Sequence, residues 1–439
     1  MSVEETLQAQ EGLAASATAL GTAEQKTKDN PNPQMGEQYR PSLATRILGG
    51  GVGLSIGAMI AAFIVGGLLI AVTDSKTQQA SQYFFARPSD TLIYGWRAAS
   101  EAYVALFQGS IFNFEANTFV RQINPLFETL TVSIPLILAG LAVAIAFRTG
   151  LFNIGAQGQI ILGAIFATFV AINFNFPLVV TLLLIIIGGL LGGAIWGGLV
   201  GLLKAKTGAH EVILSIMLNY IAVYLLQYLL KNSLQRPGNT NPISPIFEDN
   251  AIFPRIFGDG TPFRLHWGFV LALAAVFFVS WLLNRSTIGF RLRAVGANPG
   301  AAKNAGISVS AGYILVMSIA GALAGLAGAL QVSGTEKVLN TGVAASFGFD
   351  AITVALLGRS TPWGTFFAAL LYGAFRAGGT NMQVSTGTPI DLVLVVQALI
   401  VLFIAAPPLV RAIFRLPDPA KPRKKSAKKK ASQKAVEAK

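Results

Sequence analysis

The residues best suited to hold a polar solute lie in one run, Gly150–Gln159, which opens a long apolar segment and contains three glycines. Its amide side chains, Asn153, Gln157 and Gln159, can donate and accept hydrogen bonds but cannot act as acids or bases. Polar groups inside an apolar segment are costly and mark solute paths by default. We therefore favour a partly unwound helix start that lines a path. The alternative is that the amides bond neighbouring helices.

A second polar set follows one face of a single helix. Glu211, Ser215, Asn219 and Gln227 recur at multiples of four residues, which places them on the same side. This stripe fits a face that borders the path, and Asn219 favours that reading. Glu211, at the helix start, is equally consistent with simple stabilisation by the helix dipole. Phe347 could stack on a planar solute or only pack.

The sequence has few of the residues and motifs on which enzyme catalysis usually depends. The chain has no cysteine and only two histidines, so we expect neither a thiolate nor a histidine-rich metal site, and no metal or other cofactor. It contains no phosphate-binding loop of the ATPase type, no H-E-x-x-H and no G-x-S-x-G. We predict a chain that is not an enzyme, with no catalytic residue, and that does not hydrolyse ATP itself.

The elements that position these residues follow from composition. Of 439 residues, 53% are hydrophobic and 12% are charged, whereas a soluble chain is roughly 25% charged. So much apolar surface cannot all turn inward, which predicts a membrane protein. The formal charge of +13 does not indicate nucleic acid, because Arg411–Lys439 alone contributes a net +9.

Long apolar windows predict the helices. A crossing of the hydrocarbon layer needs about 20 apolar residues, and 149–203, which has no charged residue, holds two crossings with a break at 173–177. The apolar stretch 351–377 is interrupted at 358–362, so we expect two short helices or a hairpin there. We predict an all-α polytopic bundle of about ten membrane helices, some broken or re-entrant. The other expected crossings are 47–73, 129–147, 212–230, 265–284, 311–332 and 392–410.

Basic residues near the helix ends orient the bundle. With ten crossings, most arginines and lysines outside the apolar windows fall on one side, which the positive-inside rule makes cytoplasmic, together with both termini. We expect a polar, disordered cytoplasmic extension over 1–45, a transmembrane domain over 46–414 and a basic disordered tail over 415–439. The mixed-charge segments 74–127 and 231–264 then lie outside.

The cytoplasmic segment Gly289–Ile307 differs from an ordinary basic loop. Asn298-Pro299-Gly300 can start a helix, since proline costs nothing at an early helical position. A short surface helix over 301–305 follows. Such an insert predicts a docking surface for a cytoplasmic partner.

Two glycine patterns concern packing. Gly189, Gly193, Gly197 and Gly201 are spaced by four, and Gly321 and Gly325 repeat that spacing, which lets helix backbones approach closely in lipid. We draw no function from them. Separately, a phenylalanine followed ten residues later by Leu-Gly occurs twice, at 152–163 and 347–358. This echo is consistent with a duplicated half.

Four motifs together resemble one family. FRTGLFNIGAQGQIILG at 147–163, EVILSIMLNY at 211–220, the segment 289–307 and GFDAITVALLGRSTPWGT at 348–365 look like permease subunits of bacterial ABC importers. The class is that of the ribose and branched-chain amino acid permeases, and the resemblance is strongest to nucleoside or simple-sugar permeases. It covers roughly 45–415. Gln157 stands where the family often has glutamate.

The resemblance implies a multi-pass subunit of the bacterial inner membrane that moves a small polar solute, most plausibly a nucleoside or sugar. Its partners would be cytoplasmic ABC ATPase subunits, a second related permease, an extracytoplasmic substrate-binding lipoprotein and the lipid bilayer. By the same resemblance, two residue sets carry the function. The path would be bordered by Asn153, Gln157, Gln159, Ser215, Asn219 and Phe347, and the ATPases would be engaged by Arg291, Arg293, Asn298, Pro299 and Lys303.

Two other classes stay open. An ion-coupled secondary transporter usually needs a carboxylate or histidine deep in its bundle, but 149–203 has no acid and Asp350 and Asp391 are expected near external ends. An intramembrane enzyme would need paired acids or a metal cluster, which the apolar windows lack. We therefore predict an ATP-dependent importer subunit, with the secondary transporter as the alternative.

Overall fold

The computed structural model describes residues 51–405 and residue 413. Within that range, 55–405 belong to one compact unit, to which all contacts below refer. The extension predicted over 1–45 and the tail over 415–439 lie outside the described residues. The described part is helical, without a β-strand and with two isolated bridges.

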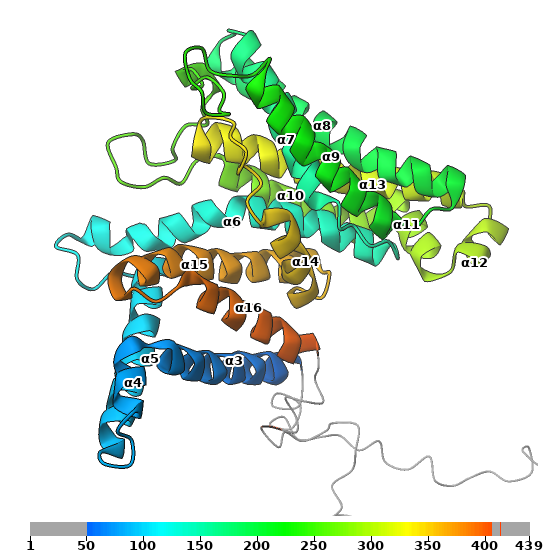
Figure 1. The fold of residues 1–439 in the computed structure, drawn as a ribbon. Helices are drawn as coiled ribbons and strands as arrows, with labels where there is room; N and C mark the ends of the chain where they lie inside the picture. Colours follow the sequence, from blue (N-terminus) through cyan, green and yellow to red (C-terminus); the bar gives the residue numbers. More distant parts are fainter. Residues whose placement is uncertain (1–50, 406–412, 414–439) are drawn as a thin grey trace, which may run out of the picture. The chain divides into compact units, whose positions relative to one another are not determined.

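The long helices follow the apolar windows of the sequence (Figure 1). The α-helices are α3 (Gly51–Thr73), α4 (Ser75–Ser81), α5 (Pro88–Ser110), α6 (Phe119–Arg148), α7 (Ala156–Asn173), α8 (Leu178–Thr207), α9 (Glu211–Lys231), α10 (Gly268–Arg285), α11 (Thr287–Ala297), α12 (Pro299–Asn304), α13 (Val309–Leu330), α14 (Phe347–Leu357), α15 (Pro362–Thr386) and α16 (Ile390–Ala405). A 3₁₀ turn covers Asp249–Ala251, and a π-helical turn, Gln331–Glu336, continues α13.

Six helices of the described part are long and apolar enough to cross a membrane: α6, α7, α8, α9, α10 and α13 with its π-helical turn. A bent pair formed by 57–73 and α4 would make a seventh. Two further apolar helices, α14 and Ile390–Phe403 in α16, are shorter. The chain is thus a polytopic helical membrane protein, while the count of ten and the cytoplasmic placement of both termini stay predictions.

The predicted breaks are confirmed. Helix α7 ends at Asn173 and α8 begins after Pro177, so the charge-free stretch holds two helices. Helix α14 ends at Leu357 and α15 begins at Pro362. Helix α15 is 25 residues long, more than the short helix expected. The turn between them forces Arg359 and Ser360 to φ values of 52° and 50°.

Helix α5 was not anticipated within 74–127. Its 23 residues include Asp90, Arg97 and Glu101, which interrupt any apolar window, so hydropathy alone did not reveal it. Arg97 and Glu101 form an exposed pair four residues apart, at 2.7 Å. The helix packs along α15, and Asn381 Nδ2 donates to Ala105 O at 2.8 Å. Packing on α15 therefore provides the burial that the helix needs.

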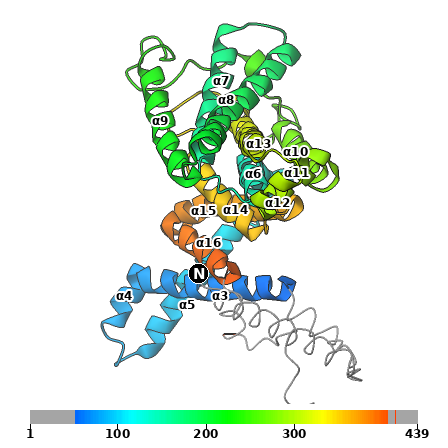
Figure 2. The same cartoon turned by 90° about the vertical axis from the view of Figure 1, so that its right-hand side faces the viewer.

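The helices pack as two similar sets. Helices α7, α8 and α13 lie against one another, as Figure 2 shows near its top, and α6, α14 and α15 also contact one another. Helices α6 and α13 join the two sets, as do α7 and α14. Fully buried residues of α6, α7 and α13, such as Leu141, Ile160 and Ala324, form the centre of the hydrophobic core.

The spaced glycines serve packing, as expected. A Cβ placed on Gly193 would collide with Gly321 O, and one on Gly325 with Gly189 O. Helices α8 and α13 therefore cross with backbone against backbone. Gly163 of α7 meets the backbone of Gly325 in the same way. Small residues allow this close approach, which supports association by van der Waals contact in lipid.

Candidate functional site

The start of α7 is held by its own amides. Asn153 and Gln159 are fully buried and bond each other twice: Asn153 Nδ2 donates to Gln159 Oε1 at 3.0 Å, and Gln159 Nε2 donates to Asn153 Oδ1 at 3.1 Å. The same Oδ1 accepts from Gly155 N at 3.1 Å. These two amides are therefore satisfied by each other at the α7 start, not by a neighbouring helix, and their place beside a path stays a prediction.

Helix α9 completes this junction. Asn219 Oδ1 accepts from Gly158 N at 2.8 Å, and its Nδ2 donates to Ile154 O at 3.0 Å, so one side chain holds both sides of the α7 start. Ser215 is also fully buried, and its hydroxyl has no hydrogen-bond partner among the described residues. Ser215 and Asn219 of the polar stripe thus face the start of α7. The exposed face of α9 carries other residues, Ile213, Met217, Tyr220, Tyr224 and Tyr228.

Gln157 connects this junction to α14. Its Nε2 donates to Ala345 O at 2.7 Å, and its Oε1 accepts from Gly348 N at 3.0 Å. Gly348 lies so close that a Cβ there would collide with the backbone of Gln157. The segment that leads into α14 is therefore fixed to the start of α7 by both ends of one amide.

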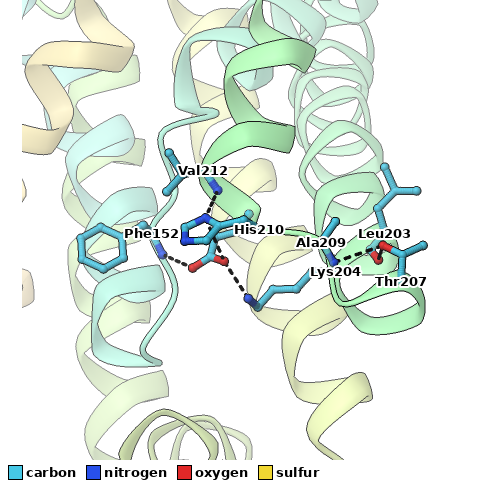
Figure 3. Close-up of polar contacts among 8 residues, drawn as sticks. Phe152, Leu203, Lys204, Thr207, Ala209, His210 and Val212 are labelled. Carbon is cyan, nitrogen blue, oxygen red and sulfur yellow. Dashed lines mark hydrogen bonds and ion pairs between the residues drawn. The ribbon is translucent and has the colours of Figure 1, made fainter.

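Glu211 contacts the end of α8 and the segment before α7, and Figure 3 shows the two residues that it meets there, Lys204 and Phe152. Lys204 Nζ, at the end of α8, lies 2.6 Å from Glu211 Oε2, and Phe152 N donates to Oε1 at 3.5 Å. His210 caps the helix, since its Nδ1 accepts from Val212 N at 3.3 Å. Glu211 is only 6% exposed. Its contacts give it a structural role at the helix start, consistent with the dipole reading.

Phe347 begins α14 beside a charged cluster. The guanidinium of Arg376 lies 4.3 Å from the centre of the Phe347 ring, within cation–π range. Arg376 Nη1 donates to Ser346 Oγ and to Asp350 Oδ2, both at 3.3 Å. Phe347 is 5% exposed and lines a cavity of about 500 Å³. Phe347, one of the six predicted path residues, thus lies at the wall of an open space.

The cluster of Arg376, Asp350 and Ser346 was missed at the sequence level. A signal existed: Arg376 interrupts the apolar start of α15, and ionisable residues in such segments are rarely incidental. Asp350 was expected only to lie near an external helix end, because no sequence spacing pairs it with an arginine 26 positions away.

The predicted docking segment has the expected short helix. Asn298 caps α12, accepting from Ala301 N at 3.0 Å through its side chain, and Pro299 takes the first helical position. Arg291, Asn298 and Lys303 are exposed. Arg293 is half-buried, and its Nη1 has no partner among the described residues. The five predicted docking residues therefore lie on one helical insert, α11 and α12.

This insert borders a groove and touches the α6–α7 connection. The groove, about 830 Å³, lies between α11, α12 and the start of α13, and Arg291 and Asn298 are among its lining residues. Gly296 of α11 packs backbone to backbone against Thr149 and Gly150, because a Cβ on either glycine would crowd the other segment. The docking segment thus abuts the residues that lead directly into the α7 start.

A buried histidine, His266, lies just before the start of α10. His266 is 1% exposed and packs on Gly334 and Thr335 of the π-helical turn. Burial, with a smaller effect from the charge of Arg264, lowers the pKa of His266 to about 4. The described residues contain no group of three or more His, Cys, Asp or Glu that could hold a metal.

The connection 232–267, which precedes α10, is bonded to the segment that leads into α14. Ser244 N donates to Leu339 O at 2.9 Å, and Phe253 N donates to Ser333 O at 3.0 Å. Leu339 N donates back to Ser244 Oγ at 2.8 Å. Backbone bonds between residues about ninety positions apart therefore order this connection.

Known proteins match the chain over most of its length. Residues 126–405 match the family described as branched-chain amino acid transport system / permease component. The guanosine ABC transporter permease protein NupP of Bacillus subtilis is 39% identical over 324 residues, 73% of this chain and 90% of the relative. The nucleoside ABC transporter permease protein NupB of Lactococcus lactis is 32% identical over 72% of this chain and 90% of the relative.

Sugar permeases are also similar. The glucose ABC transporter permease protein TsgB13 of Haloferax volcanii is 37% identical over 63% of this chain and 75% of its own length. No solved structure matches the chain. With the family match covering more than half of its residues, the chain belongs to the branched-chain amino acid transport system / permease component family.

Proposed function

We propose that this permease forms the transmembrane path of an ATP-driven importer for a nucleoside or a sugar, in the inner membrane of a bacterium. ATP hydrolysis takes place on separate cytoplasmic ABC subunits, and a second related permease and an extracytoplasmic lipoprotein complete the complex. The relatives named for guanosine, nucleosides and glucose support this solute class. Family membership supports the division of labour.

The observation that carries the proposal is the insert α11–α12. It offers a groove of about 830 Å³ with Arg291 at its wall, and Gly296 packs backbone to backbone against Thr149 and Gly150. A backbone contact without intervening side chains has no soft element to absorb motion. Binding energy at the groove can therefore reach the start of α7. The ATPases dock here, and the permeases rock between outward- and inward-open states.

The energy source separates this proposal from the ion-coupled alternative. Right-side-out membrane vesicles that contain the complete complex are loaded with ATP or with a non-hydrolysable analogue, and uptake of labelled guanosine, ribose and glucose is measured. We expect uptake of at least one of these solutes with ATP and none with the analogue. Uptake driven by an imposed proton or sodium gradient in vesicles without ATP would overturn the proposal.

Variants of the insert test the coupling. We expect Arg291→Ala and Asn298→Ala to lower ATP-dependent uptake about tenfold, equivalent to about 1.4 kcal/mol. Asn298→Ser keeps a capping side chain and should restore most of the loss. Lys206→Ala, which removes an exposed cation at the end of α8, is the matched control. Unchanged uptake in both alanine variants would exclude this surface as the coupling site.

A further inference from the structure

A cavity of about 500 Å³ lies where the π-helical turn, α6, α15 and the start of α14 meet. Its volume is within the range of small-molecule sites, roughly 300–1,000 Å³. Gln331, Thr335, Thr380 and Asn381 bring amide and hydroxyl groups to its wall, and Phe347 adds the edge of an aromatic ring. Part of the wall is a π-helical turn, an irregularity that recurs at functional sites. We name this space the outer chamber.

Both cationic side chains that line the outer chamber are paired with carboxylates of the chain. Arg264 Nη1 lies 3.2 Å from Glu128 Oε1, and Arg376 Nη1 lies 3.3 Å from Asp350 Oδ2. Both guanidinium groups are therefore neutralised by a carboxylate, and an anion would have to displace one of them. Glu336 accepts from Gln331 at 3.1 Å and keeps further lone pairs for hydroxyl donors. The wall thus suits a neutral solute rich in hydroxyl groups.

Arg376 also forms the wall of a second space. A smaller cavity, about 210 Å³, is lined by Arg376, Asp350 and Ser346 together with residues of α6 and α16. Gln397 of α16 projects into it and is 6% exposed. The ion pair, the Ser346 hydroxyl and the Phe347 ring therefore lie at the boundary between the two cavities. We name the smaller space the inner chamber.

We propose that the outer chamber binds the transported solute, a neutral polyhydroxylated ring compound such as a nucleoside or sugar, and that the Arg376–Asp350 pair is a gate to the inner chamber. This inference rests on the proposed function. The pair is suited to gating because it is partly exposed: the side chains of Arg376 and Asp350 are 31% and 23% exposed, so water can solvate both groups when they separate. A fully buried pair would pay a far larger desolvation cost.

The absence of cysteine from the chain makes the outer chamber directly testable. Thr380→Cys places one thiol at its wall, and Gln383→Cys, at an exposed position of the same helix that does not line the cavity, is the control. In the purified full-length protein, labelling by a maleimide is followed with and without guanosine, ribose, glucose or inorganic phosphate. We expect a neutral solute to slow labelling at residue 380 several-fold and leave residue 383 unchanged, with no protection by phosphate.

A second thiol tests the gate. Gln397→Cys reports access to the inner chamber, and we expect slow labelling while the ion pair is intact. Combining Gln397→Cys with Arg376→Gln and Asp350→Asn removes both charges and leaves no unpaired charge behind. We expect this triple variant to be labelled about tenfold faster. Arg376→Lys keeps a charge with a shorter reach and should give a smaller acceleration, which preserves the test if the neutral pair does not fold. Equal labelling in the folded variants would overturn the gate.

The failure of this inference can be told apart from failure of the proposed function. If the vesicles take up guanosine or a sugar with ATP but that solute never protects residue 380, the outer chamber is not its site, and the importer assignment stands. If no nucleoside or sugar is taken up in the presence of ATP, the proposed function itself is wrong. Protection by phosphate alone would also overturn the assignment of a neutral solute.

Discussion

The starts of α7 and α14 share a sequence pattern but differ in what their polar groups do. Each helix begins near a phenylalanine, Phe152 or Phe347, that is followed by a Leu-Gly pair at the same spacing. At α7 the amides Asn153 and Gln159 bond each other out of contact with solvent. At α14 the charges of Asp350 and Arg376 meet at the boundary of two cavities.

The difference teaches that position in a repeated framework does not assign function. A reciprocal amide pair that is fully buried has no reason to open, because each partner would be left unsatisfied at a cost of about 1–3 kcal/mol. In a partly exposed ion pair beside a cavity, each charged group can exchange its partner for water. We therefore regard the α7 start as a rigid junction and the α14 start as the part that responds to solute.

The largest effect is expected at a glycine of the rigid junction's helix. Gly163→Val would push a side chain into the backbone of Gly325, where neither helix can yield. We expect destabilisation of about 3 kcal/mol or more, seen as loss of monodisperse protein in detergent. Gly260→Val is the control, since nothing lies within 4 Å of its Cβ position. A well-folded Gly163→Val protein would show that α7 is not held rigidly.

Acid should lower the stability of the protein through His266, which packs on the π-helical turn before α14. His266 has a pKa of about 4 when folded and an ordinary value of 6.5 when unfolded, so stability is unaffected above pH 6.5. As the pH falls from 6.5 to 4, the unfolded chain takes up a proton that the folded chain does not, and about 3 kcal/mol is lost. Thermal unfolding of wild type and His266→Gln across this range isolates the contribution. Parallel curves would mean that His266 is not buried neutral.

Removing one amide of the junction should cost stability before it costs transport. Asn153→Leu leaves Gln159 and Gly155 N without partners in a buried place, and we expect about 2 kcal/mol of destabilisation. The double variant with Gln159→Leu should lose less than the sum of the two single losses, because the residues form one pair. If Asn153→Leu unfolds normally yet abolishes uptake, the amide contacts solute and the contrast between the two helix starts disappears.

The smallest effect concerns the link between the two regions. Gln157→Glu keeps the bond accepted from Gly348 N but cannot donate to Ala345 O. We expect a loss of about 1 kcal/mol, read as a lower melting temperature, and a larger loss for Gln157→Ala, which removes both bonds. A glutamate variant that melts above wild type would show that a carboxylate fits this position better than the amide does.

Much of the helical framework could be predicted from the sequence, because a membrane leaves few options for charge-free stretches. The breaks at 173–177 and 358–362 and the cap at Asn298 depend on local residue types. Helix α5 could not be predicted in this way, because its burial is supplied by α15, far along the chain. The bonding of 232–267 to 333–340 is similarly invisible to local patterns.

The candidate site was predictable in composition but not in role. Asn153, Gln159 and Asn219 are polar groups in or beside apolar segments, and the sequence identified them on that ground. Whether an amide meets solute or another amide depends on a partner that spacing does not reveal. Arg376 and Asp350 show the converse, since their importance arises from the cavities on either side and from a contact across 26 residues.

The crossing of α8 and α13, where glycine meets glycine, has a mechanical consequence. Helices that pack through interdigitated side chains can shift by one turn into a second stable register. Two helices whose backbones are in direct contact have no interdigitated side chains that could re-form such a register. We therefore expect α7, α8 and α13 to move as one rigid body in a transport cycle, with any hinge outside these three helices.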